Sequence, residues 1–298
     1  MNLAPIILFT YNRPSHTRRT VEALLNNVLA DKSRLFVFSD GAKDEDEQRD
    51  VHRVRDYLRK VRGFLSIRLV ERERNWGLAD SIVSGVSEVI EQYGSAIVLE
   101  DDIVTSPYFL TFMNKALSFY RHEKRVWHIS GWNYPIDPSG LPDAFLWRVM
   151  NCWGWATWAD RWQHFEKDPG RLISTFSSAD IYRFDVDGTQ DFWSQVLANY
   201  DGKINTWAIF WYATIFERSG LCLNPVRTFV NNIGHDGSGV NCGRMKGYID
   251  VLNNMPDVTL PAEIKENVRA VDAIKALTKR RRRSLLGKIQ QIFLCRIC

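Results

Sequence analysis

The first hundred residues alternate between short apolar runs and longer amphipathic segments. Four apolar runs have the length of strands buried on both faces, and they cover residues 5–10, 35–39, 65–70 and 96–99. The segments between them place apolar side chains three and four positions apart, which predicts helices over residues 15–29, 45–60 and 77–93. Ser15 is expected to cap the first helix. Strands alternating with helices predict an α/β fold with a mainly parallel central sheet and helices on both faces.

Composition is that of a globular protein with a large core. Of the 298 residues, 45% are hydrophobic and 25% are charged, which excludes a disordered chain, a collagen and a coiled coil. The longest apolar runs are much shorter than the roughly 20 residues that cross a bilayer. The amino terminus lacks the basic and apolar regions of a secretion signal. We therefore expect a cytoplasmic protein.

Charge is concentrated near the carboxyl terminus. The net charge of +4 divides into +8 over residues 275–298 and −4 over the rest. The acidic body argues against a nucleic acid as a partner. Residues 284–294 repeat apolar side chains at helical spacing after a basic cluster, so residues 279–298 are predicted to lie on an anionic membrane as a peripheral segment, at the inner face. Packing of this helix on the body, with a solvated charge run, is the main alternative.

Polar residues follow each predicted strand, where ligands of parallel sheets bind. They are Thr10, Tyr11, Arg13, Asp40, Asn75, Gly77, Glu100, Asp101 and Asp102. Three adjacent carboxylates repel one another unless a cation compensates them. Mg²⁺ or Mn²⁺ binds one or two carboxylates together with substrate phosphates. A helix amino terminus close behind would also favour the acids. No strand end carries the glycine-rich sequence of a dinucleotide site or a P-loop.

Five segments in register carry a family resemblance: ILFTYNRP (7–14), SDG (39–41), VLEDD (98–102), ISGWN (129–133) and GWATW (154–158). Together they resemble the GT-A-fold glycosyltransferases, and most of all the bacterial family 2-like branch that is similar to N-acetylglucosaminyltransferase I. The resemblance extends over residues 4–240. It implies a GT-A catalytic domain over residues 1–258, with a nucleotide-sugar-binding half (1–125) and an acceptor half with a lid loop (126–258). Residues 259–298 form the helical, basic, amphipathic tail.

The resemblance also implies roles for the residues after the strands. Arg13 contacts the diphosphate of a nucleotide-sugar and Asp40 its uracil or ribose. Glu100 and Asp101 contact the ribose and the sugar, and Asp102 holds Mn²⁺ or Mg²⁺. The metal and Arg13 would offset the charge that develops on the leaving diphosphate. We therefore expect a metal-dependent, inverting hexosyltransferase with a UDP-sugar donor. Its expected acceptor is a glycan, in particular a lipid-linked oligosaccharide of surface polysaccharide synthesis.

The second half of the chain is rich in aromatic residues, with all but one of the 11 tryptophans between positions 127 and 211. Aromatic rings beside polar groups suit the apolar faces of sugars, although most such rings form core. Trp155 and Trp158 are the best candidates for an acceptor cleft. Residues 230–239 combine glycines and asparagines with His235, which favours a lid over the nucleotide-sugar with His235 near the diphosphate or metal; a surface turn is the alternative.

The catalytic base is not evident. An inverting transfer needs a carboxylate to accept the proton of the acceptor hydroxyl. Related sequences carry an Asp beside a Trp in this region, whereas residues 205–211 here read NTWAIFW and contain no acid. Asp191 is the preferred candidate, and Glu217 is a second. The missing acid keeps a non-catalytic nucleotide-sugar- or glycan-binding protein as the alternative function. A sugar-phosphate nucleotidyltransferase is disfavoured because the first strand lacks a glycine-rich loop after it.

Overall fold

A single large sheet forms the centre of the molecule in the computed structural model, which describes residues 3–237 and 251–283. The predicted helix over residues 284–294 lies outside the described residues. The sheet has eight strands in the order β3-β2-β1-β4-β8-β6-β9-β7. Their bounds are β1 Ile6–Thr10, β2 Arg34–Ser39, β3 Ser66–Glu71, β4 Ser95–Glu100, β6 Val126–Ser130, β7 Ala144–Trp147, β8 Trp155–Trp158 and β9 Leu221–Pro225.

The first four strands are parallel, as the alternating pattern predicts. From β4 onward the sheet becomes mixed, because β8 runs antiparallel to both of its neighbours. A separate ribbon pairs β5 (Ile103–Thr105) with β10 (Val230–Asn232), also antiparallel. The fold class is therefore confirmed as α/β, with its parallel part confined largely to the first half.

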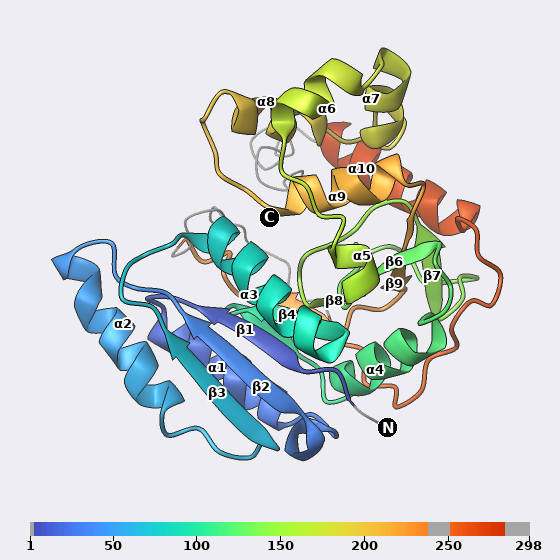
Figure 1. Ribbon diagram of the computed structural model, residues 1–298. Helices are drawn as coiled ribbons and strands as arrows, with labels where there is room; N and C mark the ends of the chain where they lie inside the picture. The colour runs from blue at the N-terminus through green and yellow to red at the C-terminus, as the bar shows by residue number, and fades with distance from the viewer. Residues whose placement is uncertain (1–2, 238–250, 284–298) are drawn as a thin grey trace.

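Helices cover both faces of the sheet. Figure 1 shows α3 crossing the face turned to the viewer and α1 on the opposite face. The bounds of the helices are α1 Pro14–Leu25, α2 Glu45–Leu58, α3 Leu78–Tyr93, α4 Phe109–Phe119, α5 Ala159–Trp162, α6 Pro169–Thr175, α7 Ser178–Phe184, α8 Trp193–Tyr200, α9 Ala208–Glu217 and α10 Val268–Arg283, with a 3₁₀ turn at Ala30–Lys32.

Helix α1 differs from its prediction at both ends. Pro14 occupies the first helical position and Arg13 precedes it as the N-cap, so Ser15 is not the cap. The helix ends at Leu25 instead of residue 29, and Val28 is 55% exposed. The side chain of Asn27 explains the early end, because it donates to Thr105 Oγ1 and accepts from the N–H of Leu110, each through a buried hydrogen bond. Apolar spacing alone could not reveal this tertiary contact.

The two tryptophans proposed for an acceptor cleft lie in the core, which corrects that assignment. Trp155 and Trp158 are 1% and 4% exposed. Their strand β8 stands between β4 and β6, so helices cover both of its faces. Trp155 stacks on Trp207 with 5.1 Å between ring centroids, and the indole N–H of Trp158 donates to the carbonyl of Leu117 in α4 at 3.2 Å.

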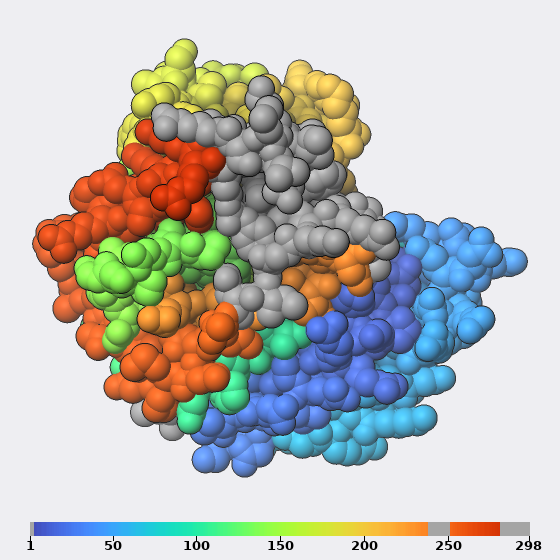
Figure 2. All heavy atoms as spheres, turned by 180° about the vertical axis from the view of Figure 1, so that it is seen from behind, coloured from blue at the N-terminus to red at the C-terminus, as the bar shows by residue number. Residues whose placement is uncertain are grey.

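The carboxyl-terminal segment packs against the second half of the sheet. Figure 2 shows residues 251–283, in orange and red, beside the green surface of the middle of the chain. The N–H of Asn267 donates to the carbonyl of Leu146 at 2.9 Å, and Ile274 of α10 is fully buried. The expected tail from residue 259 is therefore joined to the body through most of α10. Within the described residues, no helix combines the length and apolarity needed to span a bilayer.

Candidate active site

A compact charged cluster forms where β1 and β4 end side by side. β4 delivers Asp101 and Asp102, and the chain after β1 delivers Arg13 at the start of α1. Nη2 of Arg13 donates to Oδ1 of Asp101 and to Oδ2 of Asp102, the latter at 2.9 Å. Both aspartates are almost fully buried, at 3% and 5% exposure. The parallel pairing of β1 with β4 thus brings together residues almost ninety positions apart.

The cluster carries one more negative than positive charge. Asp101 Oδ2 and Asp102 Oδ1 are buried and accept no hydrogen bond from any residue that the structure describes. Burial raises the pKa of Asp101, and the neighbouring Asp102 raises it further, while Arg13 opposes both. Burial alone would lower the pKa of Arg13, but the two carboxylates outweigh it and raise that pKa. A further cation at the two remaining oxygens would complete the charge balance.

The chain segment after β10 closes on this cluster. The N–H of Ile233 donates to the carbonyl of Asp102 at 2.9 Å, which extends the pairing of β10 with β5. Gly234 follows so closely that a Cβ atom there would overlap Oδ2 of Asp102 and lie 3.1 Å from Nη1 of Arg13. Glycine is therefore required at position 234 for steric reasons. Residues 230–234, which belong to the expected lid, pack against the cluster as a wall. Closure of a lid over a nucleotide-sugar stays a prediction, and residues 238 and 239 lie outside the described part.

His235 comes next and is partly buried, and its place near a diphosphate or metal stays a prediction. Its ring meets Trp153 edge to face, with 5.3 Å between centroids. Asp236 then pairs with Nε2 of His16 in α1 at 3.1 Å. These contacts join the wall to α1, on the side of the sheet where Arg13 lies. The sequence did not single out His16 or Gly234, because neither stands in a motif near the acidic run.

Asp40 has a structural task at the end of β2. The N–H of Trp76 donates to Oδ1 of Asp40 at 2.9 Å, and the N–H of Gly77 donates to Oδ2 at 2.9 Å. Gly77 is the N-cap of α3, with φ of 78°, so Asp40 binds the positive end of this helix. Asn75 supports the same turn by donating to the carbonyl of Gly41 at 2.7 Å. A contact between Asp40 and a nucleoside stays a prediction.

The remaining strand-end residues are held by α2 or lie at the rim. The hydroxyl of Tyr11 donates to Glu47, and Asn12 donates to the other oxygen of the same carboxylate at 2.9 Å. Thr10 is buried at the end of β1, and Glu100 is partly exposed. The sequence does not distinguish Glu47 from the other acidic residues at the start of α2, so its contacts with Tyr11 and Asn12 could not be predicted. The roles of Thr10, Tyr11 and Glu100 in binding a nucleotide-sugar stay predictions.

The two carboxylates considered as catalytic bases lie on the helical part of the second half. Asp191 is exposed just before α8. The preceding Gln190 donates to Thr278 of α10 at 3.1 Å, so this turn is fixed on α10. Glu217 at the end of α9 accepts two hydrogen bonds from Arg171, at 2.7 and 2.8 Å. Glu217 is thus already paired, and the role of Asp191 stays a prediction.

The donor set suits a metal ion that keeps water or substrate ligands. Among residues 3–237 and 251–283, no group of three or more His, Cys, Asp or Glu side chains is arranged as a complete metal site. Mg²⁺ and Mn²⁺ do not need one, because one or two carboxylates and substrate phosphates suffice. The two unpaired carboxylate oxygens of Asp101 and Asp102 fit that kind of partial site.

Distant structural likenesses exist. The mannosyltransferase PcManGT from Pyrobaculum calidifontis, in complex with GDP-Man and Mn²⁺, aligns with a TM-score of 0.43 and 12% identity over 72% of this chain and 68% of that chain. TarS 1–349 from S. aureus, in complex with UDP-GlcNAc, aligns with 0.41 and 11% over 76% and 57%. The galactosyltransferase LgtC, with donor and acceptor sugar analogs, aligns with 0.38 and 12% over 71% and 70%. Such likenesses are too distant to bear on the function of this chain.

Family membership follows from the sequence. None of the curated proteins compared has significant similarity to this chain. A sequence model of the GNT-I family, however, matches residues 1–167. These residues include β1 to β4, the cluster of Arg13, Asp101 and Asp102, and the turn held by Asp40. The predicted resemblance to GT-A glycosyltransferases similar to N-acetylglucosaminyltransferase I is confirmed, and because the match covers more than half of the chain, the protein belongs to the GNT-I family and is a glycosyltransferase.

Proposed function

We propose that this protein is a metal-dependent, inverting glycosyltransferase that moves a hexosyl group from a UDP-sugar to a glycan. One observation carries the proposal: Arg13 and two buried aspartates meet at the carboxyl edge of the sheet, and each aspartate keeps one oxygen that no described residue binds. This edge is where α/β sheets bind nucleotides. An anionic donor would be repelled by the cluster as it stands, so a divalent cation is needed with it.

Asp102 would hold Mn²⁺ or Mg²⁺, with Asp101 beside it. When bound, the cation supplies a positive charge for the diphosphate oxygens as the sugar leaves. Arg13 is placed to add its guanidinium from the α1 side, because only Nη2 is committed to both aspartates. Gly234 packs against Asp102 and Arg13 on this side of the cluster. Charge stabilisation of this kind contributes several kcal/mol to glycosyl transfer.

The proton of the acceptor hydroxyl needs a base, and Asp191 is our candidate. It is an exposed carboxylate in the second half, where the acceptor is expected, and no ion pair within residues 3–237 and 251–283 holds it as Arg171 holds Glu217. Asp191 belongs to a different element from the charged cluster, just before α8. Replacement of Asp191 by Asn therefore tests the base separately from the donor site.

Lipid-linked oligosaccharides are the proposed acceptors, with the enzyme held at the inner, cytoplasmic face of a membrane by residues 279–298. The support is the basic end of α10, where Lys279 and Arg280 are exposed and the sequence continues with three more arginines. Near an anionic surface each such residue adds about 1 kcal/mol. Co-sedimentation should be strong with phosphatidylglycerol-rich vesicles and weak with phosphatidylcholine vesicles, and replacement of residues 279–283 by glutamine should abolish the difference.

Turnover separates the transferase from a binding protein. Purified protein is incubated with UDP-, GDP-, dTDP- and CMP-sugars and Mn²⁺, with and without bacterial lipid-linked glycans, and the release of nucleotide is measured. The proposal predicts release from a UDP-sugar, at least about 100-fold slower for Asp102→Asn. Asp191→Asn should slow transfer to the glycan while leaving binding of UDP unchanged.

The alternative is a non-catalytic nucleotide-sugar- or glycan-binding protein. It is favoured by residues 205–211, which lack an acid and whose Ala208 is fully buried at the start of α9. It predicts saturable binding of a UDP-sugar with no release of UDP under any of these conditions. That result would rule out the transferase proposal for this chain.

A further inference from the structure

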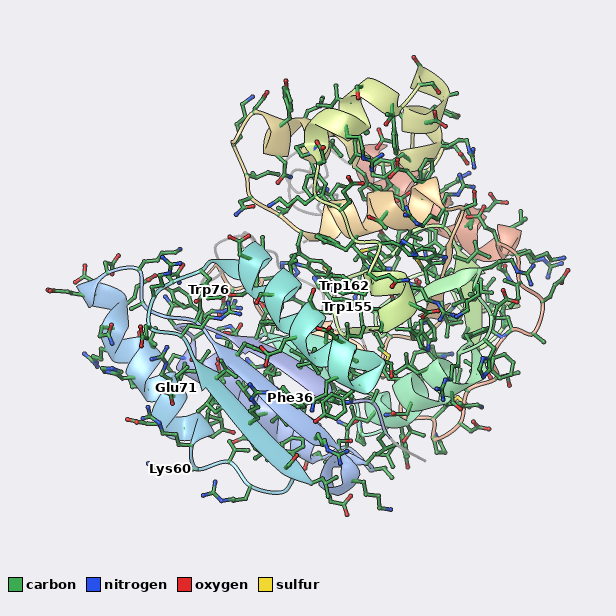
Figure 3. The ribbon with its side chains drawn as sticks, in the orientation of Figure 1. Phe36, Lys60, Glu71, Trp76, Trp155 and Trp162 are labelled. Atoms are coloured by element: carbon green, nitrogen blue, oxygen red, sulfur yellow. The ribbon has the colours of Figure 1, made fainter. Side chains whose placement is uncertain are left out.

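A cavity of about 590 Å³ lies along the outer side of α3, outside the charged cluster. Trp76 and Asn75 line one end, where α3 begins, and Phe165 and Lys167 from the chain after α5 line the other wall. Figure 3 shows Trp76 near the first turn of α3 and Trp162, against which Phe165 stacks, near α5. The cavity thus lies between the nucleotide-binding half and the second half of the chain, and its volume is typical of ligand sites.

Trp76 is a large exposed ring held in one position. It is 41% exposed, although most tryptophans of the chain are in the core. Its backbone N–H is bound by Asp40, and the guanidinium of the buried Arg72 lies 4.0 Å from the centre of its ring. Arg72 is fixed in turn by a hydrogen bond to Ser81 of α3. A preorganised aromatic surface of this kind is suited to stacking on a flat apolar face.

The polar groups of the cavity are those that bind hydroxyl groups. Asp80 and Ser84 face it from successive turns of α3, and Lys167 faces them from across the cavity. Lys167 donates to Asn205, in the segment where related sequences carry the catalytic acid. Burial lowers the pKa of Lys167, while Asp80 raises it. A carboxylate, a hydroxyl and an ammonium around an aromatic ring can together bind several hydroxyls of one sugar.

The length of the cavity favours a glycan over the base of the nucleotide. Its lining on α3 extends from Asp80 to Ser87, about 10 Å along the helix axis and away from the strand ends. The carboxylate of Asp80 accepts hydrogen bonds from sugar hydroxyls, and Arg74 and Lys167, which also line the cavity, can donate them. A nucleoside is compact and stays tied to its diphosphate at the sheet edge, so it would not fill this length.

We propose that this cavity is the acceptor subsite and takes a glycan of at least two sugar rings, one of them stacked on Trp76. The inference rests on the proposed glycosyltransferase function and assigns its acceptor to a cavity of which the sequence singled out only Asn75. It replaces Trp155 and Trp158, which are buried. The attacking hydroxyl would belong to the non-reducing ring or to a branch, because the reducing end of a lipid-linked glycan is already bonded to the lipid.

The test measures the binding of defined disaccharides by saturation-transfer NMR. The probes are N,N′-diacetylchitobiose, lactose and maltose, each added to wild-type protein with UDP and Mn²⁺. At least one should bind. Trp76→Ala and Ser84→Trp should each weaken it about tenfold or more, which corresponds to about 1.4 kcal/mol. Ser118→Trp is the matched control, because Ser118 is an exposed serine on α4 beside a different cavity.

Three outcomes overturn the proposal: no probe binds, Ser84→Trp leaves binding unchanged, or Trp76→Ala weakens UDP as much as the disaccharide. The last would assign the cavity to the nucleotide base. Failure of the proposed function is distinguishable, because the wild type would then release no UDP from a UDP-sugar, whether or not a disaccharide binds. Intact donor binding together with unaffected disaccharide binding in the variants would contradict only the acceptor subsite.

Discussion

Arg13 is the residue on which the charge balance of the site depends. Its guanidinium spans two carboxylates that follow β4, and all three groups are largely removed from water. Two buried carboxylates bound to the same guanidinium nitrogen are stable only with a positive partner. The side chain therefore stabilises the fold even before any ligand binds, and the same group is available to an anionic ligand.

Replacement of Arg13 should show how much this side chain contributes to the free energy of unfolding. Arg13→Ala leaves two buried carboxylates without their partner, so the free energy of unfolding should fall by about 3 kcal/mol or more. Arg13→Lys keeps the charge but not the planar fork, and it should lose less. Urea unfolding at neutral pH measures both. A change below about 1 kcal/mol for Arg13→Ala would show that the pair contributes little in solution.

Gly234 permits a direct test of the wall. Gly234→Ala places a methyl group against Asp102 and Arg13, so the cluster must shift and the release of UDP should fall at least about tenfold. Its matched control is Gly170→Ala, where the added Cβ meets nothing closer than 3.4 Å. The control should keep wild-type turnover. Equal rates for both variants would show that the wall does not constrain the cluster.

At the scale of elements, the packing of α9 on the sheet depends on one neutral histidine. His128 of β6 is fully buried; its Nδ1 accepts from the indole N–H of Trp211 in α9 at 3.2 Å, and Nε2 faces the carbonyl of Asn151 at 3.0 Å. Proton placement follows: Nε2 carries the hydrogen and Nδ1 does not. Burial lowers the pKa of His128 to about 3.

This histidine predicts a loss of stability in mild acid. Between pH 6.5, near which the unfolded histidine titrates, and pH 3, the unfolded chain binds a proton that the folded protein does not. Stability must therefore fall as the pH decreases through this range, and His128 adds no dependence above it. From pH 7 to 5 the wild type should lose about 2 kcal/mol more than His128→Gln, which has no proton to gain. Parallel curves of unfolding free energy against pH would contradict the assignment.

Helix α10 is packed on the folded body. Its inner face is buried, and Glu266 just before it binds Arg148 at 2.9 and 2.7 Å. Ile274→Asp would bury an unpaired charge and should destabilise the protein by at least about 3 kcal/mol. Ala276→Asp, on the exposed side of the same helix, should change stability by less than about 0.5 kcal/mol. Equal melting temperatures for the two variants would show that α10 does not pack as described.

Elements of the first half were predictable because each is encoded locally. Apolar runs and helical spacing located β1 to β4 and the helices between them to within a few residues. Errors arose where a distant residue decides the outcome, as when Asn27 ends α1 early. The aromatic second half gave no such signal, because a tryptophan in a central strand and one in a cleft look alike in a sequence. Only the position of β8 between β4 and β6 shows that Trp155 and Trp158 are core.

At the scale of the whole molecule, the two halves share one sheet, in which β4 of the first half pairs with β8 of the second. The charged cluster lies at the carboxyl edge of the parallel strands of this sheet. The family match over residues 1–167 covers the first half and the strand β8. The acidic run and Arg13 could be assigned to this edge from the sequence, since the order of parallel strands places their ends together. The contributions of Gly234 and of the cavity beside Trp76 could not, because they depend on how the second half returns to the first.

The most direct test of the account is the binding of a UDP-sugar, measured by thermal shift with Mn²⁺ and with EDTA for the wild type and Asp102→Asn. The account predicts a rise in melting temperature of several degrees for the wild type with Mn²⁺, as expected for ligand well above its dissociation constant. The rise should disappear with EDTA and in Asp102→Asn. An equal rise with EDTA, or no rise with any UDP-sugar, would contradict a metal–nucleotide site at Arg13, Asp101 and Asp102.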